Sequence, residues 1–304
     1  MLYRILQILV GLSATNLVGA KLFLHRYHGG CPVHGRVVCQ TGEVTVIADD
    51  QNQRLLRFGD ECATESRVHC QGPLPFAAGT CDGGCHECPC EFSAAEGLSA
   101  SYMQTMFDQL QPLCRADSGP SRVLMVGLGG GELPQFLLHR CPAMSVEVVE
   151  LNPAVIDAAR RFFGVAASES LAVGSAEGSK SGQARMLVEQ MDAEAAVAKR
   201  RQAASVGEYD AVLIDCFAGH GRVPETCRSR RLADDVKGIL RPGGMLLQNI
   251  WDFSPDHPEV AQGYTDTVKL YGEVFSDNLS VIDVPMPANI AWVKVLRGEL
   301  TPFG

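Results

Sequence analysis

Residues 123–132 of the chain read VLMVGLGGGE, four apolar residues followed by four glycines within five positions. The apolar run predicts a buried strand, and residues 132–140 predict the helix after it. Glycines at such a turn permit positive φ angles and let a ligand approach the backbone closely. A strand, a bare turn and a helix in this order are typical of the ligand-binding edge of a doubly wound α/β sheet.

The rest of the carboxyl-terminal half alternates strands and helices. We expect helices at 153–163, with Asn152 as the cap, and at 193–204. Further strands are predicted at 146–149, 185–188, 209–215, 245–249, 281–284 and 291–296, the last two as an antiparallel pair. Residues 168–183 are rich in Ser, Ala and Gly and predict a surface insertion, and 241–244 predict a tight turn. This alternation indicates a parallel sheet with helices on both faces.

Three carboxylates come at the ends of successive predicted strands. They are Glu150, Asp192 and Asp215, and the carboxyl ends of parallel strands meet at one edge of the sheet. A carboxylate at Glu150 can accept two hydrogen bonds from ribose hydroxyls. Glu132 stands where a dinucleotide fingerprint requires its third glycine. The shorter G-x-G-x-G loop therefore favours a nucleoside cofactor without a pyrophosphate.

The amino-terminal part has a different composition. Residues 43–58 alternate as strands do, and 99–114 predict a helix that packs this part on the larger domain. Eight of the twelve cysteines lie between Cys31 and Cys90, which favours disulfides in an oxidising compartment. A zinc site at residues 81–90 and a loop of free thiols are the alternatives. The other four, Cys114, Cys141, Cys216 and Cys227, are expected to be small core residues.

The first twenty residues predict a signal peptide. Arg4 precedes an apolar run at 5–12, and small residues follow at 18–20. A signal anchor and an amino-terminal helix packed on the core are the alternatives. We therefore expect the secretory pathway or the extracellular space, with the cytoplasm as the alternative, and membrane contact only if this segment is retained.

Length and charge limit the domain organisation and the partners. A chain of 304 residues accommodates one large and one small domain. We predict a signal-like segment at 1–20, a small β-rich, Cys-rich domain with its linking helix at 21–117, and a Rossmann-like cofactor domain at 118–304. The net charge of −9 argues against a nucleic-acid partner and is compatible with a cationic small molecule.

Five motifs together resemble the spermidine synthase family, which has the class I methyltransferase-like fold. They are the glycine turn at 123–131, VVELNPAV at 148–155, MDA at 191–193, YDAVLID at 209–215 and LRPGG at 240–244. The resemblance covers about residues 95–296, and 43–58 also looks like the family's small amino-terminal β domain.

The resemblance implies a role for each candidate site residue. Glu150 would hold the ribose and Asp192 the adenine amino group. The backbone at Gly127, Gly129 and Gly131 would approach the amino-acid or aminopropyl tail of the cofactor. Asp215 would be the catalytic residue that orients and deprotonates an attacking amine. The implied cofactor is S-adenosylmethionine or its decarboxylated form, no metal site is expected, and the family's frequent dimers imply a homodimer as one option.

The chain departs from the family at the acceptor loop. Aminopropyl transferases have a second aspartate three residues after the first, followed by proline, where this chain has Ala218 and Gly219. His220 is a candidate substitute base. The leading hypothesis is therefore a transferase that methylates, or otherwise alkylates, an unidentified small-molecule acceptor. The alternatives are an aminopropyltransferase of polyamine synthesis and a non-catalytic binding protein on the same fold.

Overall fold

The computed structural model describes most of the chain between residues 26 and 294. The described residues are 26–28, 31–33, 35–59, 64–72, 85, 88, 90–115, 119–170, 185–203, 207–218, 221–254, 257–284 and 288–294. The predicted signal peptide at 1–20, the loop cysteines Cys62 and Cys81, and both Gly219 and His220 lie outside this part. The predicted boundary at 117/118 also falls on residues that the structure does not describe.

A seven-stranded sheet forms the larger unit, in the order β10-β9-β8-β11-β12-β14-β13. Its strands are β8 (Ser121–Val126), β9 (Met144–Glu150), β10 (Met186–Gln190), β11 (Tyr209–Ile214), β12 (Leu240–Trp251), β13 (Leu279–Asp283) and β14 (Ala288–Lys294). The first five are parallel, and β14 runs antiparallel to both of its neighbours. This topology confirms the predicted doubly wound Rossmann-like class and the antiparallel pair at its end.

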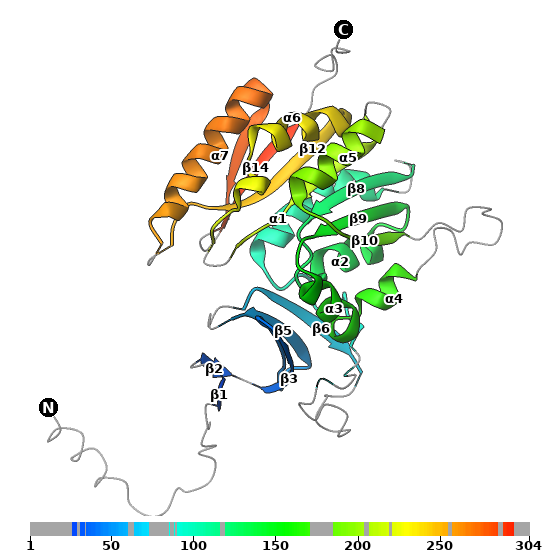
Figure 1. The fold of residues 1–304 in the computed structure, drawn as a ribbon. Helices are drawn as coiled ribbons and strands as arrows, with labels where there is room; N and C mark the ends of the chain where they lie inside the picture. The colour runs from blue at the N-terminus through cyan, green and yellow to red at the C-terminus, as the bar shows by residue number, and fades with distance from the viewer. Residues whose placement is uncertain are drawn as a thin grey trace, which may run out of the picture.

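Helices cover both faces of this sheet (Figure 1). They are α1 (Ser101–Leu110), α2 (Glu132–Arg140), α3 (Pro153–Phe162), α4 (Val165–Glu169), α5 (Ala193–Ala203), α6 (Arg230–Ile239) and α7 (Glu259–Phe275), with short 3₁₀ turns η2 (Gln111–Cys114), η4 (Glu225–Cys227) and η5 (Ser276–Asn278). Side chains alternate across β8: Val123 and Met125 pack with α1 to α3, whereas Leu124 belongs to the core under α5 to α7. Each fully buried aliphatic side chain contributes roughly 1.5–3 kcal/mol of hydrophobic free energy.

A smaller antiparallel sheet packs against the α1–α3 face (Figure 1). Its strands are β3 (Arg36–Thr41), β4 (Val44–Ala48), β5 (Gln53–Phe58), β6 (Ser66–Gln71) and β7 (Glu91–Phe92), preceded by a hairpin of β1 (Arg26–His28) and β2 (Cys31–Val33). Buried residues on one face of this sheet, among them Val46, Leu56 and Val68, form one core with those of α1 to α3, whereas Ile47 and Leu55 form a separate small cluster. Asn152, the predicted cap of α3, accepts from the Ala154 amide and donates to Glu43 at the β3–β4 turn, at 2.9 Å in both cases.

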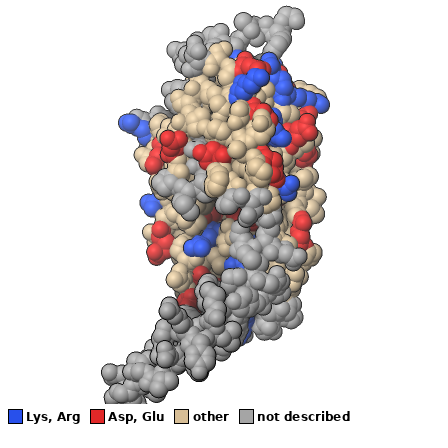
Figure 2. Space-filling view, turned by 90° about the vertical axis from the view of Figure 1, so that its left-hand side faces the viewer, with Lys and Arg blue, Asp and Glu red and all other residues tan. Residues whose placement is uncertain are grey.

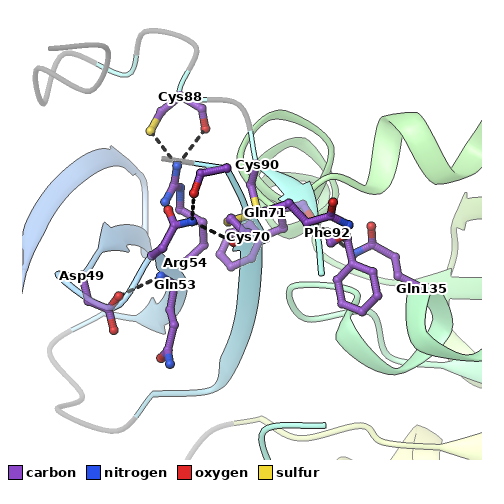
Figure 3. The surroundings of a disulfide bond; sticks show 12 residues. Asp49, Gln53, Arg54, Cys70, Gln71, Cys88, Cys90, Phe92 and Gln135 are labelled. Atoms are coloured by element: carbon purple, nitrogen blue, oxygen red, sulfur yellow. Dashed lines mark hydrogen bonds between the residues drawn. A yellow bond between two sulfur atoms is a disulfide. The ribbon is translucent and has the colours of Figure 1, made fainter. Parts of the chain in front are cut away.

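Disulfides fasten the loop before β7 to this small sheet. Cys39 is bonded to Cys85 and Cys70 to Cys90, and Cys88 is also disulfide-bonded. Figure 3 shows the buried Arg54 reaching Cys88, whose Sγ lies 3.0 Å from the Arg54 Nη2. Within the described ranges, no group of three or more His, Cys, Asp or Glu is placed to hold a metal. The disulfide prediction is therefore confirmed for the described part of the 81–90 loop.

The prediction for the other four cysteines was wrong. Cys114 is bonded to Cys141, and Cys216 to Cys227, with Cα separations of 4.4 and 6.4 Å. Cys141 and Cys227 are buried, as a core residue would be, so burial alone does not distinguish a thiol from a half-cystine. The pairing depends on which helix and loop ends the sheet brings together.

Two local predictions also differ from the structure. Ser168 does not begin an irregular insertion, because it lies in α4, is buried and donates to the Gln135 Oε1 at 3.0 Å. Residues 241–244 bulge within β12, since Tyr209 pairs with Leu240 but Ala211 pairs with Met245. Among the described helices, none is both long and apolar enough to cross a bilayer.

Candidate active site

A cavity of about 520 Å³ opens at the carboxyl ends of the parallel strands. It lies where the strand order reverses between β8 and β11, and residues before β6 form its opposite wall. Its volume is in the usual range for a small-molecule site. Five of the six predicted site residues line it: Gly127, Gly129, Glu150, Asp192 and Asp215.

A second cavity, of about 450 Å³, lies at α5 and the edge strand β10. Its charged side chains pair with one another: Arg122 with Glu147 and Glu208, and Arg200 with Glu147 and Glu189. Because these charges are mutually compensated, we place the candidate site in the first cavity.

The turn requires glycine at two positions for two separate reasons. Gly127 has φ +94°, and a Cβ there would lie 2.0 Å from the backbone oxygen of Asp215. Gly131 has φ +74° and faces Val165 of α4, which its Cβ would approach to 2.6 Å. Gly131 is not among the residues that line the cavity. Its glycine is required by packing, and its predicted contact with the cofactor tail stays a prediction.

Glu150 and Asp192 are both fixed by backbone amides. Leu128 N–H donates to one oxygen of Glu150 at 3.0 Å, and Asn152 N–H donates to the other at 2.8 Å. Since a carboxylate oxygen can accept two hydrogen bonds, both oxygens of Glu150 can still take a ribose hydroxyl. Asp192 caps α5 by accepting from the Ala195 amide at 3.1 Å. The geometry is compatible with the ribose and adenine roles that the resemblance implies.

Asp215 is held by two donors from distant elements. The Tyr102 hydroxyl of α1 donates to its Oδ2 at 2.8 Å, and the Asn249 Nδ2 of β12 donates to its Oδ1 at 3.0 Å. Burial raises the pKa of Asp215, and these two hydrogen bonds offset only part of the rise. Burial and the Asp215 carboxylate raise the pKa of Tyr102 well above its usual value, so its hydroxyl stays a donor.

Sequence reasoning missed Tyr102 and Asn249 as site residues. Tyr102 falls within the helix predicted at 99–114, but its partner Asp215 lies 113 residues away in the chain. Asn249 was expected only as the end of a strand. Its position at the carboxyl end of a central strand was the available signal.

Glu132 is a third residue that the sequence did not single out for chemistry. It is buried at the start of α2, lines the cavity, and accepts hydrogen bonds from the amide and the hydroxyl of Ser99. Burial raises the pKa of Glu132 to about 7, although Ser99 and the Arg67 charge lower it in part.

The cavity carries negative charge. Its described lining contains the carboxylates of Glu43, Glu65, Glu132, Glu150, Asp192 and Asp215, and no Lys or Arg. Carboxylates gathered around a low-dielectric cleft raise the local concentration of cations. The site therefore favours a ligand that carries positive charge.

The loop after Asp215 forms one end of the cavity. The Cys216–Cys227 disulfide closes it, and Phe217, Ala218 and Gly221 line the cavity between the two cysteines. Gly221 packs on the Trp251 ring so tightly that a Cβ would lie 2.2 Å from a ring carbon. The rings of Phe217 and Trp251 lie 5.7 Å apart. In the described part of this loop, small and aromatic residues line the end of the cavity, and Ala218 stands where aminopropyl transferases have a second carboxylate.

Known sequences similar to this chain include two kinds of transferase. A polyamine aminopropyltransferase of Vibrio vulnificus is 27% identical over 52% of this chain and 46% of its own length. The eEF1A lysine and N-terminal methyltransferases of Xenopus laevis and Homo sapiens are 41% and 28% identical over 46% and 43% of this chain, and 18% of theirs in both cases. The chain thus spans less than half of each of these relatives. No family model matches it.

Solved structures similar to this one have the same fold. A probable spermidine synthase from Corynebacterium glutamicum matches with a TM-score of 0.60 and 17% identity, covering 86% of this chain and 80% of that one. Spermidine synthase in complex with the transition state analogue AdoDATO matches with a TM-score of 0.54 and 13% identity, covering 85% of this chain and 73% of that one. Human methyltransferase-like protein 13 in complex with SAH matches with a TM-score of 0.50 and 23% identity, covering 66% of this chain and 84% of that one. The spermidine synthase-like resemblance and the Rossmann-like methyltransferase fold are confirmed.

Replacing Glu132 by Gln should change how stability depends on pH. Between pH 4.5 and about 7 the unfolded chain releases this proton while the folded chain keeps it, so the native state loses stability as the pH rises. The loss attributable to Glu132 should reach about 3 kcal/mol by neutral pH. Urea unfolding should show that the free energy of unfolding of Glu132→Gln, relative to that of the unsubstituted protein, increases by an amount of this order between pH 5 and pH 7.5. Glu96→Gln, an exposed control, should follow the unsubstituted protein, and parallel pH curves for all three proteins would refute the assignment.

The Cys216→Ser/Cys227→Ser pair should loosen the loop at one end of the cavity without disturbing the glycine turn. Removing a cross-link of this loop length releases roughly 3 kcal/mol of chain entropy. Amide hydrogen exchange at 216–227 should accelerate by roughly 10- to 100-fold, with 123–135 unchanged. The matched pair Cys114→Ser/Cys141→Ser should leave exchange at 216–227 as it was. Equal exchange there in both pairs would contradict the proposed bracing.

Proposed function

We propose that this chain, which resembles the spermidine synthase family, transfers a methyl group from S-adenosylmethionine to an amine. The observation that carries the proposal is the placement of Asp215, which lies beside the glycine turn in a cavity that also contains Glu150 and Asp192. The relatives' names support an amine, since they specify polyamine, lysine and N-terminal acceptors. The aromatic, singly acidic end of the cavity supports methyl transfer over polyamine synthesis.

The residues around the cavity can hold the cofactor without a metal ligand set. Glu150 would offer both of its oxygens to the ribose, and Asp192, which lines the same cavity, would accept a hydrogen bond from the adenine amino group. The backbone at Gly127 and Gly129, which lines the cavity, would leave room for the amino-acid tail of the cofactor. The remaining carboxylates compensate the positive charge of a sulfonium.

Asp215 would act as the general base. An amine arrives as an ammonium and becomes nucleophilic only after losing a proton, which the Asp215 carboxylate can accept. Burial raises the pKa of Asp215, which makes it a stronger base, and Tyr102 and Asn249 keep it oriented. When bound, S-adenosylmethionine supplies the electrophile: the amine lone pair forms the N–C bond while the S–C electron pair stays on sulfur. Alignment of the nucleophile is then the main contribution of the protein.

Aminopropyl transfer is the second candidate, and one observation favours it. Decarboxylated S-adenosylmethionine has no carboxylate, and the described lining of the cavity offers neither Lys nor Arg to pair with one. Ala218 weighs against this candidate, because a diamine acceptor has a second ammonium that needs its own carboxylate.

The acceptor is a small molecule or an amine on a protein, and a nucleic acid is not supported. On the face drawn in Figure 2, basic and acidic side chains are interspersed, with no broad basic patch among the described residues.

The disulfides support an oxidising location, which we propose to be the secretory pathway or the extracellular space. Protein isolated without reductant should then react with thiol reagents only after denaturation in the presence of reductant. Titratable thiols at the described half-cystines in freshly isolated protein would argue for the cytoplasm instead.

Replacing Asp215 by Asn should separate binding from chemistry. Methyl transfer from S-adenosylmethionine to n-pentylamine or a lysine-containing peptide should fall by about 10²- to 10⁴-fold, because the base is lost. The Kd for S-adenosylhomocysteine, measured by calorimetry, should change by less than about threefold. Asp108→Asn, an exposed control on α1, should match the unsubstituted protein.

Calorimetric titration of the unsubstituted protein with S-adenosylmethionine and with its decarboxylated form, followed by product analysis, distinguishes the three functions. Preferential binding of decarboxylated S-adenosylmethionine, with a new polyamine formed from putrescine, would replace methyl transfer by aminopropyl transfer. Cofactor binding with no transfer to any amine would indicate a non-catalytic protein, and no cofactor binding would refute the site itself.

A further inference from the structure

Asn249 has a buried polar atom without a hydrogen-bond partner. Its side chain is 2% exposed, lies near the carboxyl end of β12 and lines the cavity. The Nδ2 donates to Asp215, as described above, whereas the Oδ1 is buried and receives no hydrogen bond from any described residue.

The chemistry of the pair fixes which end of the amide is unpaired. Asp215 presents an acceptor at 3.0 Å, so the opposite orientation of the amide would set a carbonyl oxygen against a carboxylate oxygen. The Nδ2 must therefore face Asp215, and the Oδ1 remains the free acceptor. Native structures contain few buried acceptors of this kind, and each one calls for an explanation.

We propose that the Asn249 Oδ1 accepts an N–H of the nucleophile and so selects an amine over a hydroxyl acceptor. This inference rests on the proposed function and assigns a second contact at the same site. An ammonium gives one proton to Asp215 and keeps two N–H groups if it is primary. One of these can donate to the Asn249 Oδ1 while the nitrogen lone pair faces the methyl group.

A hydroxyl nucleophile cannot make the same set of contacts. Its single O–H donates to Asp215, which leaves the Asn249 Oδ1 buried and unpaired. Sites built to bind a polar hydrogen discriminate strongly against ligands that lack it. An aspartate at 249 would repel Asp215 and lose the donor, whereas an asparagine supplies a donor to Asp215 and an acceptor to the ligand.

The test measures binding of two small cations to the protein saturated with S-adenosylhomocysteine. The probes are n-pentylamine, whose ammonium has N–H groups, and n-pentyltrimethylammonium, which has the charge alone. Asn249→Leu should weaken the binding of n-pentylamine by about 10- to 100-fold and the binding of n-pentyltrimethylammonium by less than about threefold. 1-Pentanol serves as the uncharged probe, and its affinity should not fall.

Tyr102→Phe is the matched control, because it removes the other donor to Asp215 and leaves the Asn249 Oδ1 in place. Tyr102→Phe should weaken the binding of n-pentylamine clearly less than Asn249→Leu does. Equal losses in the two variants, or equal losses for both cations, would mean that Asn249 only positions Asp215 and would overturn the inference. So would unchanged n-pentylamine affinity in Asn249→Leu, or no affinity in the unsubstituted complex.

Binding of S-adenosylhomocysteine by each variant is measured first. Failure of the unsubstituted protein to bind it would refute the proposed function and not the role of Asn249 alone. If Asn249→Leu misfolds and therefore does not bind S-adenosylhomocysteine, Asn249→Ala replaces it. This smaller side chain removes the same carbonyl, and the same outcomes apply.

Discussion

The close approach of two backbone segments, at Gly127 and Asp215, is the constraint on which the site depends. The amide of Asp215 donates to Val126 at 2.8 Å, and a Cβ at Gly127 would overlap the Asp215 carbonyl. Only glycine permits this spacing at φ +94°. The same turn brings the Leu128 amide to Glu150, so one glycine sets the relative positions of Asp215, the proposed base, and Glu150, the carboxylate expected to hold the ribose.

The small amino-terminal sheet completes the cavity. The amide of Gly130 donates to the Ser66 Oγ of β6 at 2.8 Å, which attaches the glycine turn to the smaller unit. The disulfides of Cys39 and Cys70 in turn brace the loop before β7, which packs against the end of α3. The cavity is therefore shared between the larger, mainly parallel sheet and a cross-linked antiparallel one. The Cys216–Cys227 disulfide braces the opposite end independently.

Burial and negative charge act together on the chemistry. Removing carboxylates from water raises their pKa, as at Asp215 and Glu132, and strengthens their pull on a cation. Under the proposed function, a sulfonium and an ammonium would repel each other within one cavity, and these carboxylates would offset that repulsion. Tyr102 and Asn249 keep Asp215 oriented while leaving each of its oxygens able to accept once more.

The sequence by itself determined the fold class, the glycine turn and the carboxylates at successive strand ends, because these follow from local periodicity and from turns that only glycine can form. It could not determine the Tyr102 and Asn249 contacts with Asp215, the pairing of Cys216 with Cys227, or the packing role of Gly131. Those depend on which distant segments the sheet order places side by side. Burial was equally out of reach: the raised pKa of Glu132 and the unpaired oxygen of Asn249 exist only because tertiary packing excludes water from side chains that sequence pattern leaves unassigned.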